Sequence, residues 1–154
     1  MSIKDVGVQE AHQLQTTGGY TYVDVRSVPE YENGHPEGAH NVPLLHRDSQ
    51  TGQMTPNPEF LAVMQANYAS DAKLLIGCQV GGRSSRAVQM LTAAGYGSAM
   101  NVKGGFGGFR DPATGQVVDD GWEQQGLPVE SGSPQGMGYD ALRQNVGGTS
   151  DATG

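Results

Sequence analysis

The segment 74–94 constrains the fold and the chemistry of this chain more than any other. An apolar run at 74–77 ends at Cys78, and Gly81 and Gly82 follow within four residues. Beyond them, apolar residues recur at the spacing of one helical face: Ala87, Val88, Leu91 and Ala94. Such a pattern predicts a strand, a tight turn and a helix, with Ser84 or Ser85 as the helix N-cap.

Cys78 is the single cysteine among 154 residues. A turn and a helix start surround its sulfur with unpaired backbone N–H groups, and the positive end of the helix dipole adds to their effect. Both stabilise the thiolate, which is the nucleophilic form of cysteine. The alternative is a buried structural cysteine. Two glycines and an arginine directly after Cys78 favour the nucleophile, because a core cysteine needs neither.

The loop is short, since four residues separate Cys78 from Arg83 in the pattern CxxGxR. A short ring of N–H donors suits a sulfur atom, whereas a longer one suits a tetrahedral oxyanion. Two roles for Arg83 stay open: it pairs with an incoming anion, or it holds the loop against a carboxylate. The expected substrate-binding residues are therefore those of the loop: Gln79, Val80, Gly81, Gly82, Arg83 and Ser84.

Short strands and helices alternate along the chain. The expected strands are 21–25, 39–42, 74–77 and 99–102, and the expected helical segments are 10–15, 29–33, 59–68 and 85–94. This alternation predicts an α/β fold with right-handed crossovers and a mostly parallel sheet. In such a sheet ligands bind beyond the carboxyl ends of the strands, where Cys78 lies.

Composition excludes several classes of function. A net charge of −7 argues against a nucleic-acid surface, and one cysteine excludes an internal disulfide and a cysteine-rich zinc site. No apolar stretch approaches the roughly 18 residues of a membrane span, and the first residues lack the apolar core of a secretory signal. We expect one cytoplasmic, monomeric domain that takes small-molecule partners and needs no cofactor or metal.

Three ordered motifs resemble the rhodanese family of sulfurtransferases across roughly residues 6–129. The first comprises Tyr22-Val23-Asp24-Val25-Arg26-Ser27, Glu30-Tyr31 and the run 34–44 from Gly34-His35 to Pro43-Leu44; the second is the loop 78–84; the third is Gly104-Gly105 with Trp122 and Gly126-Leu127-Pro128-Val129. The resemblance implies a three-layer α/β domain, with a small, mostly parallel sheet between helices, at residues 1–130. Residues 131–154 would form a Gly/Ser-rich tail, flexible or loosely docked, with a short helix near 137–146.

The family also implies an activity. Cys78 would accept a sulfane sulfur from thiosulfate or a related donor, become a persulfide, and pass the sulfur to cyanide or to a thiol, including a protein thiol. The alternatives are a persulfide carrier or a regulatory binding module, and a phosphatase or arsenate reductase. Relatives of the latter kind have one more residue between cysteine and arginine, which disfavours that reading.

The expected supporting residues are Asp24, Arg26 and His35. Asp24 would accept hydrogen bonds from the loop or from Arg83, or else pair locally, and Arg26 would form an ion pair with Glu30. A Cys–His nucleophile and base is the less favoured role of His35, because a thiolate that the loop stabilises needs no base.

Two irregular stretches, 47–57 and 106–121, are expected as surface segments near the entrance of the site, the first as a loop and the second with a small turn or hairpin at 111–118. Phe106, Phe109 and Trp122 could contribute apolar contacts there, although a role in the core or in anchoring loops is the better interpretation.

Overall fold

A parallel sheet forms the centre of the computed structural model, which describes residues 4–48, 50–80 and 82–151. Within those residues the sheet has five strands in the order β1-β8-β7-β2-β4, and each neighbouring pair is parallel. The strands are β1 (Asp5–Val6), β2 (Thr21–Asp24), β4 (His40–Asn41), β7 (Leu74–Gly77) and β8 (Ala99–Val102). The central position of β7 places the end of this strand, and hence Cys78, in the middle of the sheet edge.

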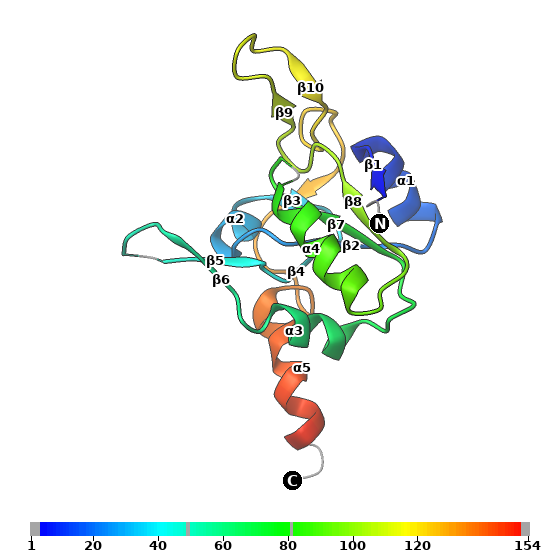
Figure 1. Cartoon of the computed structure of the whole chain (residues 1–154), viewed down its shortest axis with the longest axis vertical. Helices are drawn as coiled ribbons and strands as arrows, with labels where there is room; N and C mark the ends of the chain where they lie inside the picture. Colours follow the sequence, from blue (N-terminus) through cyan, green and yellow to red (C-terminus); the bar gives the residue numbers. More distant parts are fainter. Residues whose placement is uncertain (1–3, 49, 81, 152–154) are drawn as a thin grey trace.

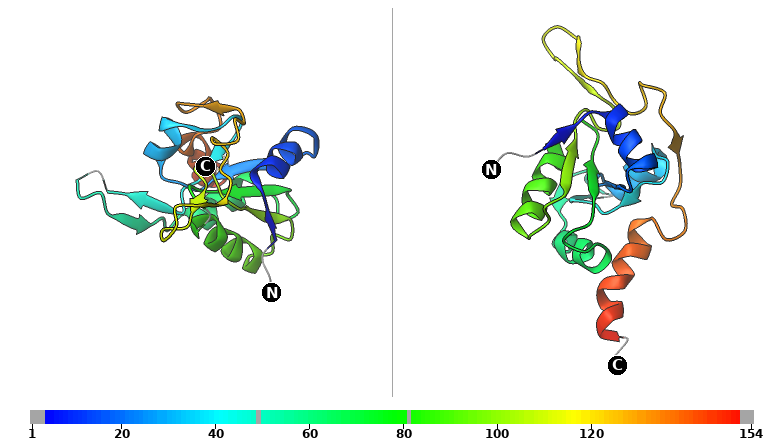
Figure 2. Two further views of the ribbon diagram at one scale, coloured as in Figure 1. Left: turned by 90° about the horizontal axis from the view of Figure 1, so that it is seen from above. Right: turned by 90° about the vertical axis from the view of Figure 1, so that its right-hand side faces the viewer.

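Helices cover both faces of this sheet (Figures 1 and 2). They are α1 (Val8–Thr17), α2 (Val28–Asn33), α3 (Phe60–Asn67), α4 (Gly82–Ala93) and α5 (Tyr139–Asp151). The parallel sheet between helices confirms the predicted three-layer α/β fold. Helices lie on the sheet because neighbouring parallel strands must be joined by crossover connections.

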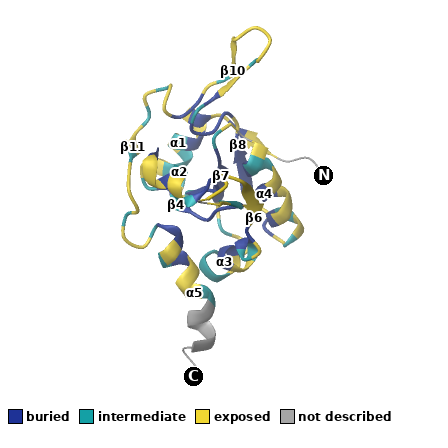
Figure 3. Ribbon diagram, turned by 90° about the vertical axis from the view of Figure 1, so that its left-hand side faces the viewer, coloured by how far each residue is buried: buried dark blue, intermediate teal, exposed yellow. Residues whose placement is uncertain are grey.

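The two faces of the sheet build two separate apolar cores, because successive side chains of a strand point to opposite sides. Val23 and its cross-strand partner Ile76 belong to the core that includes α3, α4 and α5. Tyr22 and its partner Leu75 belong to the other core, which includes α1 and the fully buried Trp122. Figure 3 shows the buried strands between helices whose outer sides are exposed.

The predicted boundaries agree best where apolar runs are sharply bounded. The strands at 74–77 and 99–102 match β7 and β8, whereas the N-cap prediction for α4 is wrong. This helix begins at Gly82, so Ser84 lies inside its first turn. Its hydroxyl donates to the side-chain oxygen Oδ1 of Asn101 instead of capping the helix.

A hairpin replaces the loop expected at 47–57. Strands β5 (Leu45–Arg47) and β6 (Met54–Pro56) pair antiparallel and project from the body beside α2 (Figure 1). The turn that joins them is stabilised by Asp48, whose Oδ1 accepts the N–H groups of Gln50 and Thr51 at 2.8 and 3.2 Å. Local side-chain bonds of this kind are hard to distinguish from an irregular loop in a sequence.

A second hairpin, β9 (Phe109–Arg110) and β10 (Val117–Asp119), lies where a turn or hairpin was expected and extends away from the domain. Phe109 is 40% exposed on it, while Phe106 and Trp122 are buried at its base. The core interpretation therefore holds for Phe106 and Trp122 but not for Phe109. Strands β3 (His35–Pro36) and β11 (Val129–Glu130) form a third antiparallel pair.

The C-terminal helix α5 lies against α3. Tyr139 and Leu142 are buried in the same core as α3, and the Asn67 side chain donates to the Leu142 carbonyl at 2.9 Å. The predicted helix at 137–146 is thus present, whereas the division of the chain at residue 130 stays a prediction. Among the described residues, no helix is long and apolar enough to cross a membrane.

Candidate active site

Cys78 is the first residue after β7 and lies at the N-terminus of α4, with 1% of its surface exposed. The Ser84 backbone N–H donates to its Sγ at 3.3 Å. Because Ser84 is in the first turn of a helix of 12 residues, the helix dipole directs positive potential at the sulfur. The predicted strand–turn–helix environment for a thiolate is therefore present.

A chain of polar contacts leads from the buried sulfur to an exposed carboxylate. The Cys78 thiol donates to Ser84 Oγ at 3.3 Å, and Ser84 Oγ donates to Asn101 Oδ1 at 2.5 Å. The Asn101 amide in turn donates to Asp5 Oδ1 at 2.9 Å. These contacts fix the position of the Ser84 hydroxyl beside the sulfur. Protein groups, and not water, therefore satisfy its hydrogen bonds.

The glycine-rich turn after β8 forms the wall behind Cys78. Phe106 N–H donates to the Cys78 carbonyl at 2.7 Å, and Gly107 N–H donates to the Gln79 carbonyl at 2.9 Å. Gly105 has φ +56°, and a Cβ on it would lie 2.2 Å from the Cys78 oxygen. Only glycine permits both this backbone conformation and this close approach.

The other loop residues lie as follows. The Gln79 side chain accepts a hydrogen bond from Arg26 Nη1 at 3.2 Å, Val80 is 45% exposed on the outside of the loop, and Gly82 begins α4. Gly81, which we expect to bind substrate, lies outside the described residues. The substrate-binding role of these residues stays a prediction.

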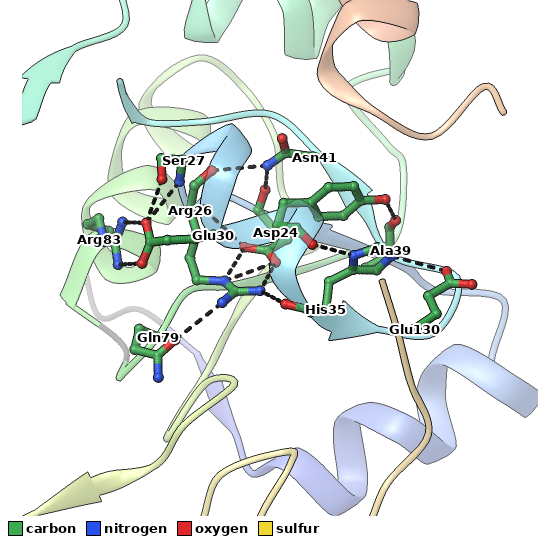
Figure 4. Close-up of polar contacts among 12 residues, drawn as sticks. Asp24, Arg26, Ser27, Glu30, His35, Ala39, Asn41, Gln79, Arg83 and Glu130 are labelled. Atoms are coloured by element: carbon green, nitrogen blue, oxygen red, sulfur yellow. Dashed lines mark hydrogen bonds and ion pairs between the residues drawn. The ribbon is translucent and has the colours of Figure 1, made fainter. Parts of the chain in front are cut away.

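Arg83 forms a two-point ion pair with Glu30 of α2 (Figure 4). Its Nη1 and Nη2 donate to Glu30 Oε1 and Oε2 at 2.8 and 3.1 Å. Burial alone would raise the pKa of Glu30, but hydrogen bonds from Arg83 and Ser27 lower that pKa to about 2. Of the two roles left open by the sequence, this geometry matches the one in which Arg83 holds the loop against a carboxylate.

Arg26 pairs with Asp24, so the predicted Arg26–Glu30 ion pair is wrong. Arg26 Nη2 lies 2.7 Å from Asp24 Oδ2, and the Arg26 backbone N–H donates to Asp24 Oδ1 at 2.9 Å. Both side chains are almost fully buried. Glu30 pairs with Arg83 of α4 instead, and its Oε1 also accepts hydrogen bonds from the backbone N–H and hydroxyl of Ser27 in the capping box of α2. Asp24 thus pairs locally instead of accepting bonds from Arg83.

The Arg26 guanidinium joins three parts of the site. Besides Asp24 and Gln79, it donates to the Gly34 carbonyl at 2.5 Å, and it lies 4.5 Å from the centre of the Phe106 ring. Burial lowers the pKa of Arg26, but the charge and hydrogen bonds of Asp24 outweigh burial and raise it. Arg26 therefore stays charged and links β2 to the loop and to the glycine-rich turn.

His35 is fully buried and belongs to a separate network. Its Nδ1 lies 2.7 Å from the Tyr31 carbonyl and its Nε2 lies 3.2 Å from Glu130 Oε2, while its ring stacks on that of Tyr31. With both ring nitrogens engaged, His35 does not serve as a base for Cys78. Across the described ranges, no three His, Cys, Asp or Glu side chains gather as a metal site would require.

Three residues of this site were missed from the sequence as partners of the loop: Asn101, Asp5 and, for Arg83, Glu30. A signal existed for Asn101, because it is a polar residue within an otherwise apolar strand. Glu30 was singled out in the sequence, but as the partner of Arg26, and Asp5 carried no signal, since exposed carboxylates are common at strand ends.

Comparisons with known proteins agree with this geometry. The family model for the rhodanese-like domain matches residues 7–111. Thiosulfate sulfurtransferase 16, chloroplastic, of Arabidopsis thaliana is 32% identical over 126 residues, covering 82% of this chain and 92% of that protein. The senescence-associated protein DIN1 of Raphanus sativus is 36% identical over 126 residues, covering 81% of this chain but only 60% of that protein.

Among solved structures, the crystal structure of Rv0390 from M. tuberculosis superposes with a TM-score of 0.68 at 28% identity. The match covers 86% of this chain and all of that one. The loop at the end of β7, the parallel sheet and these similarities lead to one conclusion: the chain belongs to the rhodanese-like sulfurtransferase family.

Proposed function

We propose that this protein is a sulfurtransferase that carries a sulfane sulfur on Cys78, from thiosulfate or a related donor to cyanide or a thiol. The observation that carries the proposal is the position of Cys78 Sγ. It lies at the N-terminus of α4, with the Ser84 N–H directed at it, on a loop with too few residues for a tetrahedral oxyanion.

In the first step the Cys78 thiolate attacks the outer sulfur of thiosulfate. A new S–S bond forms, the bond between the two sulfurs of thiosulfate breaks, and sulfite leaves with the electron pair. In the second step an acceptor attacks the outer sulfur of the persulfide, and Cys78 leaves as a thiolate. Two successive displacements predict ping-pong kinetics.

The surrounding residues support both steps without forming covalent bonds. The Ser84 N–H and the α4 dipole stabilise negative charge on Sγ before attack and again when Cys78 is the leaving group. The Asp24–Arg26 and Glu30–Arg83 pairs hold the loop in the shape that keeps the N–H groups directed at the sulfur.

The proposal is tested by the intact mass of the protein before and after thiosulfate, and again after cyanide. We expect a gain of one sulfur, about 32 Da, which cyanide removes as thiocyanate. Cys78→Ser should fold but gain no sulfur and lose turnover, whereas Ser85→Ala, one residue beyond the sulfur contact, is the matched control.

Sulfur uptake by the Cys78→Ser variant, or none by the wild-type protein, would overturn the proposal. A phosphatase substrate tested alongside addresses the rival enzyme class, because release of phosphate without sulfur uptake would assign the site to that chemistry. Thiocyanate formation that needs an added acceptor protein would point instead to a persulfide carrier.

A further inference from the structure

A cavity borders the loop that carries Cys78, because Arg83 of that loop is among its lining residues. A cavity of about 400 Å³ is lined by residues of three elements, α2, α4 and the β5–β6 hairpin. They are Glu30, Leu45, Arg47, Gly52, Met54 and Arg83. This volume falls within the roughly 300–1,000 Å³ of small-molecule pockets.

The carboxylate of this cavity is already neutralised. Glu30 Oε1 accepts hydrogen bonds from the Ser27 N–H and hydroxyl and from Arg83 Nη1, while Oε2 accepts from Arg83 Nη2. The Glu30–Arg83 pair therefore contributes little net charge to the cavity.

Arg47 is the remaining charged group that lines it. Its guanidinium lies over Gly52, since a Cβ on that glycine would lie 3.7 Å from Arg47 Nη2. The adjacent Asp48 faces the hairpin turn, where its Oδ1 accepts the Gln50 and Thr51 N–H groups. Among the residues that the structure describes, no carboxylate lies within ion-pair distance of Arg47.

We propose that this cavity binds the carboxylate of a low-molecular-mass thiol acceptor, with Arg47 as the residue that selects it. The proposal deepens the proposed function and rests on it. Guanidinium groups bind carboxylates at two points, and the Leu45 and Met54 side chains offer apolar contact to the stem of such a thiol. Arg83 is common to the cavity and the loop: it lines the cavity, and it directly precedes Ser84, whose N–H donates to Cys78 Sγ.

The transfer balances without any further reactant. The acceptor thiolate attacks the outer sulfur of the Cys78 persulfide, forming one S–S bond. The S–S bond to Cys78 breaks, and Cys78 departs as a thiolate, so that the acceptor leaves as a persulfide with no net oxidation or reduction.

The test compares 3-mercaptopropionate with the neutral 2-mercaptoethanol as acceptors, with thiosulfate as donor. Arg47→Ala should lower kcat/KM for mercaptopropionate relative to mercaptoethanol by about tenfold, the equivalent of one lost charge-assisted hydrogen bond. Arg47→Glu should lower this ratio further. The preference of the wild-type protein for mercaptopropionate should also decline as salt is raised.

Arg110→Ala is the matched control, because Arg110 is an exposed arginine on the other hairpin. An unchanged ratio in Arg47→Ala, or an equal fall in Arg110→Ala, would overturn the inference. The proposed function is judged separately by the mass gain of the wild-type protein. If the protein gains sulfur but the ratio of kcat/KM for the two acceptors does not change in Arg47→Ala, the proposed sulfur transfer is retained and the proposed acceptor site is rejected.

Discussion

Two arginine–carboxylate pairs flank the candidate active-site loop, and they differ in burial rather than in chemistry. Both are two-point contacts, but the Asp24–Arg26 side chains are at most 4% exposed, whereas those of Glu30 and Arg83 are 27% and 20% exposed. In the first pair Arg26 also donates to Gln79 of the loop inside the domain (Figure 4), and the second pair joins two helices. We therefore expect the buried pair to matter most for the stability of the domain and the half-buried pair to matter most for the shape of the loop.

The largest effect is expected from breaking the buried pair. Asp24→Asn leaves the Arg26 charge buried without its carboxylate, and the free energy of unfolding should fall by about 3–5 kcal/mol. Urea unfolding measures the loss, with Asp71→Asn, an exposed carboxylate, as the control. The double variant with Arg26→Met should be less destabilised than the sum of the two single changes, because it removes both charges. Strict additivity would show that the pair is not coupled.

A smaller effect is expected from breaking the half-buried pair. Arg83→Ala and Glu30→Gln should each lower stability by only about 1 kcal/mol, as ion pairs near solvent do. Each should also lower kcat/KM about tenfold for thiosulfate and for a second sulfur donor alike, because both changes release the loop. Steady-state kinetics with two donors checks this. A rise in KM for thiosulfate alone, seen with Arg83→Ala but not with Glu30→Gln, would mean that Arg83 binds the donor.

The third effect, which concerns stability alone and not activity, is the acid dependence of the same pair. Since the pKa of Glu30 is lowered from 4.5 to about 2, its contribution to stability is complete above pH 4.5 and is lost as the pH falls toward 2. Because Glu30 is partly exposed to solvent, we expect the loss to be on the order of 1 kcal/mol. Unfolding of wild type and Glu30→Gln across this range measures it. The two curves should converge at low pH, and parallel curves would contradict the assignment.

The pattern of burial explains which features could be predicted from sequence. Strands β7 and β8 are short apolar runs with sharp ends, and the position of Cys78 after the first follows directly from them. Arg26 and Arg83 could not be matched to their carboxylates in this way. Glu30 is four residues from Arg26 but 53 residues from Arg83, and only the approach of α2 to α4 decides between the two.

Gly105 has a consequence for the order in which the protein can become active. The Cys78 carbonyl packs against the backbone of this glycine, and Phe106 N–H bonds to that carbonyl. Contacts between residues distant in the chain form late, because the closure of the intervening segment costs entropy. A nascent chain that has delivered the cysteine and α4, but not yet the turn after β8, therefore carries its nucleophile without the wall behind it. We expect the surroundings of Cys78 to be complete only when β8 has joined the sheet, so that the protein becomes able to react at the same stage at which its fold is completed.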